Sequence, residues 1–406
     1  MNIFFVVDNF TPDLGAASFR FEGIVKELAD RGNKVKIIAS YPNRIDLKNF
    51  KEFEYNNVEI HRINKKSLKE GIINRAITYF KFFCEAIKNG KEMSKDSDIV
   101  IATSPQLLVG VAGAIISKLN KKSFLIDIRD LWPDIVLEMG VMKRYNPIYL
   151  FLKMLEKFMY KQSKFLIYNS PGFYNYLISK YDKKKMELIT NGIDDYILDY
   201  FKNKEIVITK KNKYKILYAG NIGIAQDIKI LVEFAKKYKS KVEITIIGKG
   251  SQESLIKNLI MENQIENIQL ISSVPRNELL EKYEEADILF LQLKDIKMFE
   301  KTIPSKIFEY LASQKPILYG VEGVAKKILK EEFYRKYYFK ANDVEDLIET
   351  FENLIKDIEE NKYIKPDLEK LINNYSRKKL SINYADKIEE LCEESYEIFK
   401  ESNQIL

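Results

Sequence analysis

A short apolar run followed by two glycines decides the fold: Lys215-Ile-Leu-Tyr-Ala-Gly220-Asn-Ile-Gly223-Ile-Ala-Gln-Asp227. Its first five residues are typical of a buried strand, and a helical pattern runs from Asp227 to Lys239. Glycines between a strand and a helix let a ligand approach the backbone and leave helix N-terminal N–H groups to face an anion. The stretch therefore predicts a strand–loop–helix unit with an anion-binding loop.

The same alternation continues through both halves of the chain. In the second half we expect strands at Val242–Ile247, Ile268–Ile271, Ile288–Leu291 and Pro316–Tyr319, and helices at Ser251–Asn263, Asn277–Glu285 and Ser305–Ser313. In the first half we expect strands at Asn2–Val7, Lys34–Ala39, Val58–Ile63, Asp98–Ala102, Ser123–Ile128, Phe165–Tyr168 and Met186–Ile189, and helices at Ser18–Gly32, Ser67–Lys95, Leu107–Leu119 and Pro147–Gln162. Such alternation favours an α/β fold with parallel, doubly wound sheets.

Two such domains facing a central cleft are expected. The first covers residues 1–195 and the second residues 214–375, joined by a polar linker over 196–213. Residues 376–406 have the pattern of one long amphipathic helix. In doubly wound sheets ligands bind beyond the carboxyl ends of the strands, so functional residues are sought in the loops there.

Composition excludes several classes of protein. Of 406 residues, 46% are hydrophobic and 31% charged, which suits folded domains rather than a disordered chain. Two cysteines exclude a disulfide scaffold, and one histidine, His61, excludes metal centres built on several histidines. His61 falls within an expected strand, so a structural role is predicted. The first ten residues lack a basic leader pattern and no run is long enough to span a bilayer, so a cytoplasmic location is expected.

Positive charge is concentrated in the first half. Residues 1–195 hold 31 Lys and Arg against 23 Asp and Glu, whereas the remainder holds 35 against 36. Lys153, Lys157 and Lys161 follow one another at helical spacing near aromatic residues, which predicts docking on an anionic membrane surface. The alternative is a solvated helix face over an ordinary core. A nucleic-acid partner is not expected, because no recognition motif occurs.

Other glycine-bearing loops follow expected strands. Gly15 and Ala16 precede a helix that carries Arg20, and Gly248 and Gly250 follow a strand of the second half. Three such loops predict a phosphate-bearing ligand, although a tight turn is the alternative for Gly15. Neither a dinucleotide fingerprint nor a P-loop motif occurs.

The strongest candidate site is Thr302-Ile-Pro304-Ser305-Lys306-Ile-Phe-Glu309-Tyr310. Pro304 and Ser305 suit the opening of a helix, and Lys306 and Glu309 are three residues apart, so they share a helix face. We expect Lys306 to meet a phosphate and Glu309 to meet a hydroxyl group. The alternative is a surface salt bridge between the two side chains.

Several motifs together resemble the GT-B glycosyltransferases of family 4, most closely the branch of bacterial O-antigen and capsule N-acetylfucosaminyl transferases. The matching stretches occur in order along the chain: Phe10–Arg20, Arg31–Val35, Asp127-Ile-Arg-Asp130-Leu-Trp-Pro-Asp134, Asn191–Asp194, Tyr218–Gln226, Ala286–Ile288 and Pro304–Ala312. The resemblance implies the GT-B fold, two Rossmann-like domains with a C-terminal helix that crosses back to the first.

For function, the resemblance implies a retaining, metal-independent transfer of an N-acetylated amino or deoxyamino sugar. The implied donor is a UDP-sugar, and the implied acceptor is a polyprenyl-diphosphate-linked saccharide at the inner face of the cytoplasmic membrane. No cofactor is expected. The implied donor-binding residues are Gly220, Asn221, Gly223, Gln226, Gly248, Gly250, Pro304 and Ser305.

The expected catalytic residues are Lys306, Glu309 and Asp130, of which Asp130 orients the acceptor hydroxyl unless it merely caps a helix. Gly15, Ala16 and Arg20 are expected near the diphosphate or the acceptor. The pair Asp96 and Asp98 precedes a strand rather than following one, which argues against a metal-binding Asp-x-Asp motif.

The sequence departs from the family pattern at three positions. Asn221 and Gln226 stand where the family has an arginine and a lysine that meet the diphosphate, and Lys301 stands where it has a glutamate. The diphosphate is therefore expected to rely on Lys306 and on backbone N–H groups. A nucleotide-sugar 2-epimerase of the same architecture and a non-catalytic nucleotide-sugar-binding subunit are the alternatives.

Overall fold

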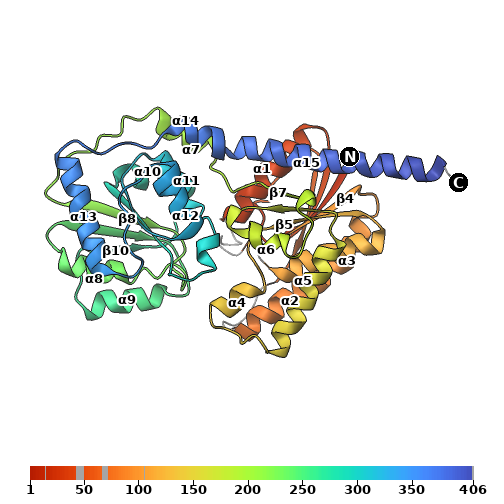
Figure 1. The fold of residues 1–406 in the computed structure, drawn as a ribbon, viewed down its shortest axis with the longest axis horizontal. Helices are drawn as coiled ribbons and strands as arrows, with labels where there is room; N and C mark the ends of the chain where they lie inside the picture. The colour runs from red at the N-terminus through yellow and green to blue at the C-terminus, as the bar shows by residue number, and fades with distance from the viewer. Residues whose placement is uncertain (14, 43–49, 66–71, 105, 405–406) are drawn as a thin grey trace. The chain divides into compact units, whose positions relative to one another are not determined.

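The computed structural model describes residues 1–13, 15–42, 50–65, 72–104 and 106–404. The chain forms two compact units, one made of Met1–Gly192 with Arg377–Leu406 and the other of Ile193–Ser376 (Figure 1). The linker expected over residues 196–213 is partly wrong, because helix α7 (Asp195–Lys202) occupies its first residues and belongs to the second unit. The apolar residues Ile197, Leu198 and Phe201 bury one face of α7 and explain why it is helical.

Unit 1 is built on a parallel sheet. Within the described residues its strands follow the order β3-β2-β1-β4-β5-β6-β7. Successive strands are therefore added on one side of β1 as far as β3, and on its other side from β4 onward. Ile3 of β1 pairs with Val35 on one side and with Ile99 on the other. The strands are β1 (Asn2–Val6), β2 (Lys34–Ser40), β3 (Val58–Ile63), β4 (Ile99–Ser104), β5 (Ser123–Ile128), β6 (Phe165–Tyr168) and β7 (Met186–Leu188).

Helices cover both faces of this sheet. Figure 1 shows α1 and α15 along one face and α2, α3 and α5 along the other. The described helices are α1 (Ala16–Asp30), α2 (Ile72–Met93), α3 (Leu107–Asn120), α4 (Asp134–Glu138), α5 (Pro147–Gln162), α6 (Tyr174–Ile178) and α15 (Arg377–Gln404), with short 3-10 turns at Pro171–Phe173 and Lys183–Lys185. The first residues of the helix expected over Ser67–Lys95 lie outside the described residues.

The C-terminal helix completes the core of unit 1. Tyr384, Ala385 and Ile388 of α15 are fully buried with Phe21 and Leu28 of α1. Arg31, just after α1, forms ion pairs with Asp386 (2.7 Å) and Glu389 (2.8 Å) of α15. The last helix therefore belongs to the first unit, as the sequence predicts.

Unit 2 repeats the design on a smaller scale. Its described strands are parallel and follow the order β10-β9-β8-β11-β12, with the reversal between β8 and β11. They are β8 (Tyr214–Ala219), β9 (Val242–Ile247), β10 (Ile268–Ile271), β11 (Ile288–Gln292) and β12 (Ile317–Gly320).

The remaining described helices of unit 2 are α8 (Ile230–Lys237), α9 (Glu253–Glu262), α10 (Arg276–Glu285), α11 (Lys306–Ala312), α12 (Gly323–Lys327), α13 (Val344–Glu359) and α14 (Leu368–Tyr375), with short non-α turns at Phe299–Lys301 and Ile328–Glu332. Helix α8 begins three residues later than predicted, after Asp227 adopts a left-handed conformation (φ 43°). Two Rossmann-like parallel-sheet units therefore confirm the predicted fold class. In the described part of the chain, each helix is too short or too polar to cross a bilayer.

Candidate functional site

Glycines hold two loops of unit 2 in close backbone contact at the carboxyl ends of β8 and β9. A Cβ atom on Gly248 would lie 1.8 Å from the carbonyl oxygen of Gly220, and one on Gly250 would lie 2.2 Å from that of Ile222. Gly220 and Gly248 also have φ values of +151° and +153°, which side chains rarely adopt. These glycines are therefore required by geometry, and the loops lie beside the reversal of strand order, where such sheets bind ligands.

Lys306 reaches this loop pair from the start of α11. A Cβ on Gly220 would lie 1.9 Å from both Cε and Nζ of Lys306, so the ammonium group packs directly on the glycine. Its Nζ lies 4.0 Å from the centre of the Tyr218 ring. Burial lowers the pKa of Lys306 to about 7, against which the nearby Glu309 carboxylate raises it. The loop thus holds a cation that an incoming anion would stabilise.

Glu309 lies one turn further along α11. Its Oε2 accepts a hydrogen bond from the Tyr283 hydroxyl (2.7 Å), and the Tyr283 ring packs edge-on against Tyr310 (5.7 Å between centroids). Among the described residues, Glu309 and Lys306 form no ion pair, so the surface salt bridge considered as an alternative is not made. Ser305 precedes α11 without a side-chain capping bond, and Pro304 accepts a backbone bond from Ile307 (3.1 Å).

The side chains of Asn221 and Gln226 are uncharged amides that form a hydrogen bond with each other. Asn221 Nδ2 donates to Gln226 Oε1 (3.1 Å), and a Cβ on Gly223 would lie 2.4 Å from that same Nδ2. Gly223 therefore makes room for the amide pair. Residues 220–226 carry no charged side chain, and Lys306 is the cation in contact with Gly220.

Sequence analysis missed one side chain that forms hydrogen bonds to the backbone of this loop. Gln292, fully buried at the end of β11, donates through Nε2 to the carbonyl oxygens of Gln226 (3.2 Å) and Asp227 (2.8 Å). Its Oε1 accepts from the Asn342 backbone N–H (3.0 Å). A buried glutamine at the end of an apolar strand was the only signal that pointed to it.

In unit 1, Arg20 of α1 is buried. Its side chain projects from α1 into the interior, where Nε pairs with Asp127 Oδ2 (2.9 Å) and Nη1 donates to Thr190 O (2.8 Å). Gly15 is extended (φ 174°), a conformation open to any residue, so the argument from glycine geometry does not apply there. Ala16 opens α1 directly after it.

Asp130 follows β5 at the carboxyl edge of the unit 1 sheet. Burial raises the pKa of its carboxyl group to about 6, although the neighbouring Arg129 lowers it. The residue that precedes α4 is Pro133, not Asp130, so the helix-capping alternative is not realised. A carboxyl group with this pKa suits hydrogen bonding to a hydroxyl group near neutral pH.

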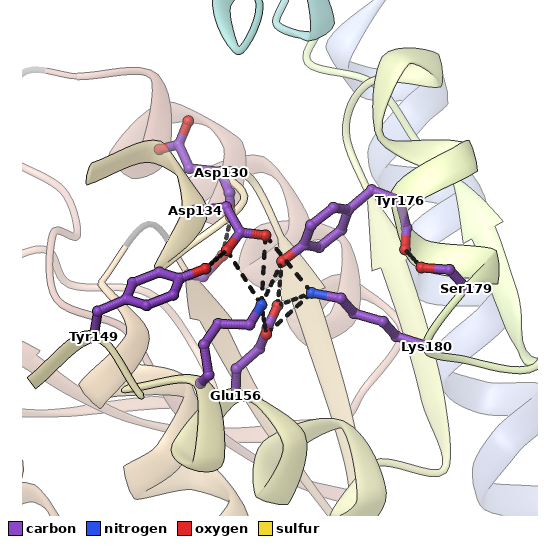
Figure 2. Close-up of polar contacts among 9 residues, drawn as sticks. Asp130, Asp134, Tyr149, Glu156, Tyr176, Ser179 and Lys180 are labelled. Atoms are coloured by element: carbon purple, nitrogen blue, oxygen red, sulfur yellow. Dashed lines mark hydrogen bonds and ion pairs between the residues drawn. The ribbon is translucent and has the colours of Figure 1, made fainter. Parts of the chain in front are cut away.

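Lys153 does not belong to an exposed lysine stripe, contrary to prediction. It is half-buried in a network where its Nζ donates to the Tyr176 hydroxyl (3.1 Å) and pairs with Glu156 and Asp134 (Figure 2). Glu156 also accepts from Tyr176 (2.6 Å) and Lys180 (2.9 Å). Two lysines and two carboxylates therefore neutralise one another inside the unit. Figure 2 shows the Asp130 carboxylate pointing away from this network.

The other two lysines of the stripe, Lys157 and Lys161, are exposed. Beside them α5 exposes an apolar stripe at three-residue spacing: Ile148 (59% exposed), Phe151 (56%) and Met154 (68%). Large apolar side chains of this kind seldom gather on a helix face that meets only water.

The Asp-x-Asp pair and the single histidine lie where the sequence predicts. Asp98 precedes β4 and accepts from the Asn2 backbone N–H (2.8 Å), and Asp96 pairs with Lys36 (3.0 Å). Both therefore lie at the amino end of the sheet, opposite the loops described above. His61 lies within β3.

Residues 199–371 match the family described as "Glycosyl transferases group 1". This match covers less than half of the chain. Gly220, Gly248, Lys306 and Glu309 all lie within the matched region. Residues 5–194 match a second family, described as "Domain of unknown function (DUF1972)".

Individual relatives agree with the group 1 match. "Probable glycosyltransferase WbjE" of Pseudomonas aeruginosa is 22% identical over 264 residues, which are 63% of this chain and 66%, a little under two thirds, of that protein. Anabaena Alr3699/HepE, solved in complex with UDP-glucose, is similar in structure (TM-score 0.69, 12% identity, 96% of this chain and 100% of that one).

WaaG, described as a glycosyltransferase involved in lipopolysaccharide biosynthesis, is also similar in structure (TM-score 0.64, 14% identity, 96% of this chain and 99% of that one). At these identities the structural likeness establishes the fold alone, which is that of GT-B proteins.

Proposed function

We propose that this chain is a retaining glycosyltransferase that moves an N-acetylated amino or deoxyamino sugar from a UDP-sugar to a polyprenyl-diphosphate-linked saccharide. The reaction would serve bacterial surface polysaccharide synthesis. The match to group 1 glycosyl transferases supports glycosyl transfer, and the complex of HepE with UDP-glucose supports a UDP-sugar donor. The involvement of WaaG in lipopolysaccharide biosynthesis supports a polysaccharide pathway.

The observation that carries the proposal is the packing of the Lys306 ammonium group against Gly220 and the Tyr218 ring. Glycosyl transfer from a nucleoside diphosphate sugar requires stabilisation of the diphosphate that leaves. A preorganised cation in a water-poor site stabilises such developing charge strongly. Lys306 and the N–H groups of the Gly220 and Gly248 loops would supply it, so we propose that no metal ion is required.

Glu309 of unit 2 and Asp130 of unit 1 would supply the remaining roles. Glu309, oriented by Tyr283, would accept hydrogen bonds from hydroxyl groups of the donor sugar. Asp130 would orient the acceptor hydroxyl, and an oxygen of the leaving phosphate would take its proton, so no separate side-chain base is needed. The donor-sugar carbon loses its bond to the diphosphate and gains one to the acceptor oxygen on the same face.

We propose that the protein docks on the inner face of the cytoplasmic membrane to reach its lipid-linked acceptor. The exposed stripe Ile148, Phe151 and Met154, with Lys157 and Lys161 beside it, replaces the lysine stripe as the docking surface. Apolar side chains would enter the headgroup region and the lysines would meet anionic lipid.

The test is release of UDP from a panel of UDP-sugars with a polyprenyl-diphosphate-linked acceptor, with and without a chelator. We expect acceptor-dependent release that survives the chelator, is lost in Lys306→Met and Glu309→Ala, and is retained in Asp96→Asn. UDP-sugar binding without any release would identify a non-catalytic binding subunit, and activity restored only by manganese would overturn the metal-independent route.

A further inference from the structure

Three arginines gather inside unit 1 at the carboxyl end of β5. Arg20 comes from α1, Arg129 from the residue after β5, and Arg377 from the first position of α15. The packed pair α1 and α15 brings two of them together: Arg20 lies 5.4 Å from the Tyr384 ring of α15, and Arg377 lies 5.7 Å from the Phe19 ring of α1. Arg377 also donates to Gly192 O (2.7 Å).

Several buried donors of Arg20 and Arg129 have no acceptor among the described residues. Arg20 is bound by Asp127 and Thr190, but its Nη2 is buried and has no hydrogen-bond partner in the described part of the chain. The same holds for Nε and Nη1 of Arg129, whose backbone N–H is anchored to Ser104 Oγ (3.2 Å). A buried donor without an acceptor costs roughly 1–3 kcal/mol, and more when it is charged.

The charges around Arg129 do not balance. Burial lowers the pKa of Arg129, the carboxylates of Asp127 and Asp130 oppose this, and Arg20 and Arg377 add to it. Arg129 thus lies near two carboxyl groups and two further cations, and burial also favours the neutral form of Asp130. Buried cations without full compensation destabilise a fold, and a bound anion would supply the missing compensation.

We propose that Arg129 binds a phosphate group of the lipid-linked diphosphate acceptor. The positive charges of Arg20 and Arg377 would attract the same phosphate group. The inference rests on the proposed function, since it names the part of the acceptor that unit 1 recognises. The planar guanidinium group offers parallel N–H donors that match two oxygens of a phosphate. The donor's diphosphate has the same chemistry, so the test separates the two sources.

The experiment measures binding of farnesyl diphosphate, UDP and farnesol to the full-length protein by calorimetry, without any transfer reaction. The variants are Arg129→Met, Arg129→Lys, Lys306→Met and, as the matched control, Arg144→Met, which removes the same charge from an exposed site. We expect Arg129→Met to weaken farnesyl diphosphate binding about tenfold or more, with a smaller loss in Arg129→Lys. Arg144→Met should bind all three probes as the native protein does.

UDP binding should be unchanged in Arg129→Met and weakened in Lys306→Met. The proposal is overturned if Arg129→Met binds farnesyl diphosphate as tightly as the native protein does. It is also overturned if the native protein binds farnesol as tightly as farnesyl diphosphate, or if Arg129→Met loses affinity for UDP and not for farnesyl diphosphate. Without ligand, Arg129→Met should unfold at the same or a higher temperature, and a clearly lower one would assign the guanidinium a structural role and overturn the proposal. Failure of sugar transfer with every donor, while Arg129-dependent diphosphate binding persists, would count against the proposed function alone.

Discussion

The ammonium group of Lys306 lies over the ring of Tyr218, 4.0 Å from its centre, and not against a carboxylate. The ring supports the cation electrostatically from one side. Tyr218 is itself fixed, because it is fully buried and its hydroxyl donates to Asn221 O (2.6 Å). The strand that ends in the glycine loop therefore also supports the cation of that loop.

This arrangement predicts a pH-dependent affinity for UDP. With a pKa lowered to about 7, Lys306 loses its proton as the pH rises through 7 in the free protein, whereas the bound diphosphate requires the charged form. We expect UDP affinity to fall as the pH rises from 6.5 to 8.5, with proton uptake on binding at the higher pH. Calorimetry in buffers of different ionisation enthalpy measures the uptake, and Lys306→Met should remove it. Equal proton uptake in that variant would contradict the prediction.

Two glycine substitutions should have different effects, because different atoms occupy the space. In Gly220→Ala the new Cβ meets the flexible end of Lys306, so UDP affinity should fall by about tenfold, and the positive φ at this position should cost roughly 1–3 kcal/mol of stability. In Gly248→Ala it meets the Gly220 carbonyl oxygen, so the free energy of unfolding should drop by roughly 2–4 kcal/mol. Chemical denaturation and UDP titration of both variants provide the check, and reversed effects would refute the packing argument.

Replacing Asp130 should stabilise the protein and impair transfer. Because its pKa is raised to about 6, its stabilising contribution is complete below its unfolded pKa near 4 and is lost as the pH rises through 6. Asp130→Asn should therefore raise the free energy of unfolding at pH 7.5 on the order of 2 kcal/mol, with little change at pH 4. Denaturation at the two pH values tests this, and a destabilised variant at pH 7.5 would contradict it.

Glu156 should be essential to the stability of unit 1. It is 2% exposed and binds Lys153, Lys180 and Tyr176 at once. Glu156→Gln leaves two buried lysines with one carboxylate, which should reduce the free energy of unfolding by about 3 kcal/mol. Glu138→Gln is a suitable control, because no ion pair of Glu138 occurs among the described residues. Equal stability of the two variants would show that the network contributes little.

The apolar stripe on α5 should govern membrane binding. We expect Phe151→Ser combined with Met154→Ser to reduce sedimentation with anionic vesicles severalfold at any salt concentration, since each side chain contributes buried apolar area. Lys157→Gln combined with Lys161→Gln should reduce binding chiefly at low salt. A native protein that does not sediment with anionic vesicles at low salt would refute membrane docking.

The sequence predicts local features of the site well. The glycine loops and the start of α11 follow from short patterns, because a turn between strand and helix is determined by a few adjacent residues. The predicted strands recur with shifts of one or two residues at their ends. The order of the strands in each sheet depends on long-range pairing, which periodicity alone does not determine.

Features that depend on distant residues were missed or misjudged. Gln292 and Asn342 are fifty residues apart, and nothing in either stretch alone indicates their contact. Lys153 appeared to continue an exposed stripe, but its ammonium group is bound by Tyr176 of α6 and by Asp134 of α4. Arg20 lies near the predicted loop in sequence, yet Asp127, more than a hundred residues later, decides where its guanidinium points.

The place of α15 in unit 1 has a consequence for how the protein is made. Residues that complete the core around Phe21 and Leu28 leave the ribosome after all of unit 2 has been synthesised. The nascent chain must therefore hold the first unit unfinished, with the apolar side of α1 uncovered, while the second unit folds ahead of it. Chaperones that shield apolar surface on nascent chains would be needed longest by the part of the protein that is translated first.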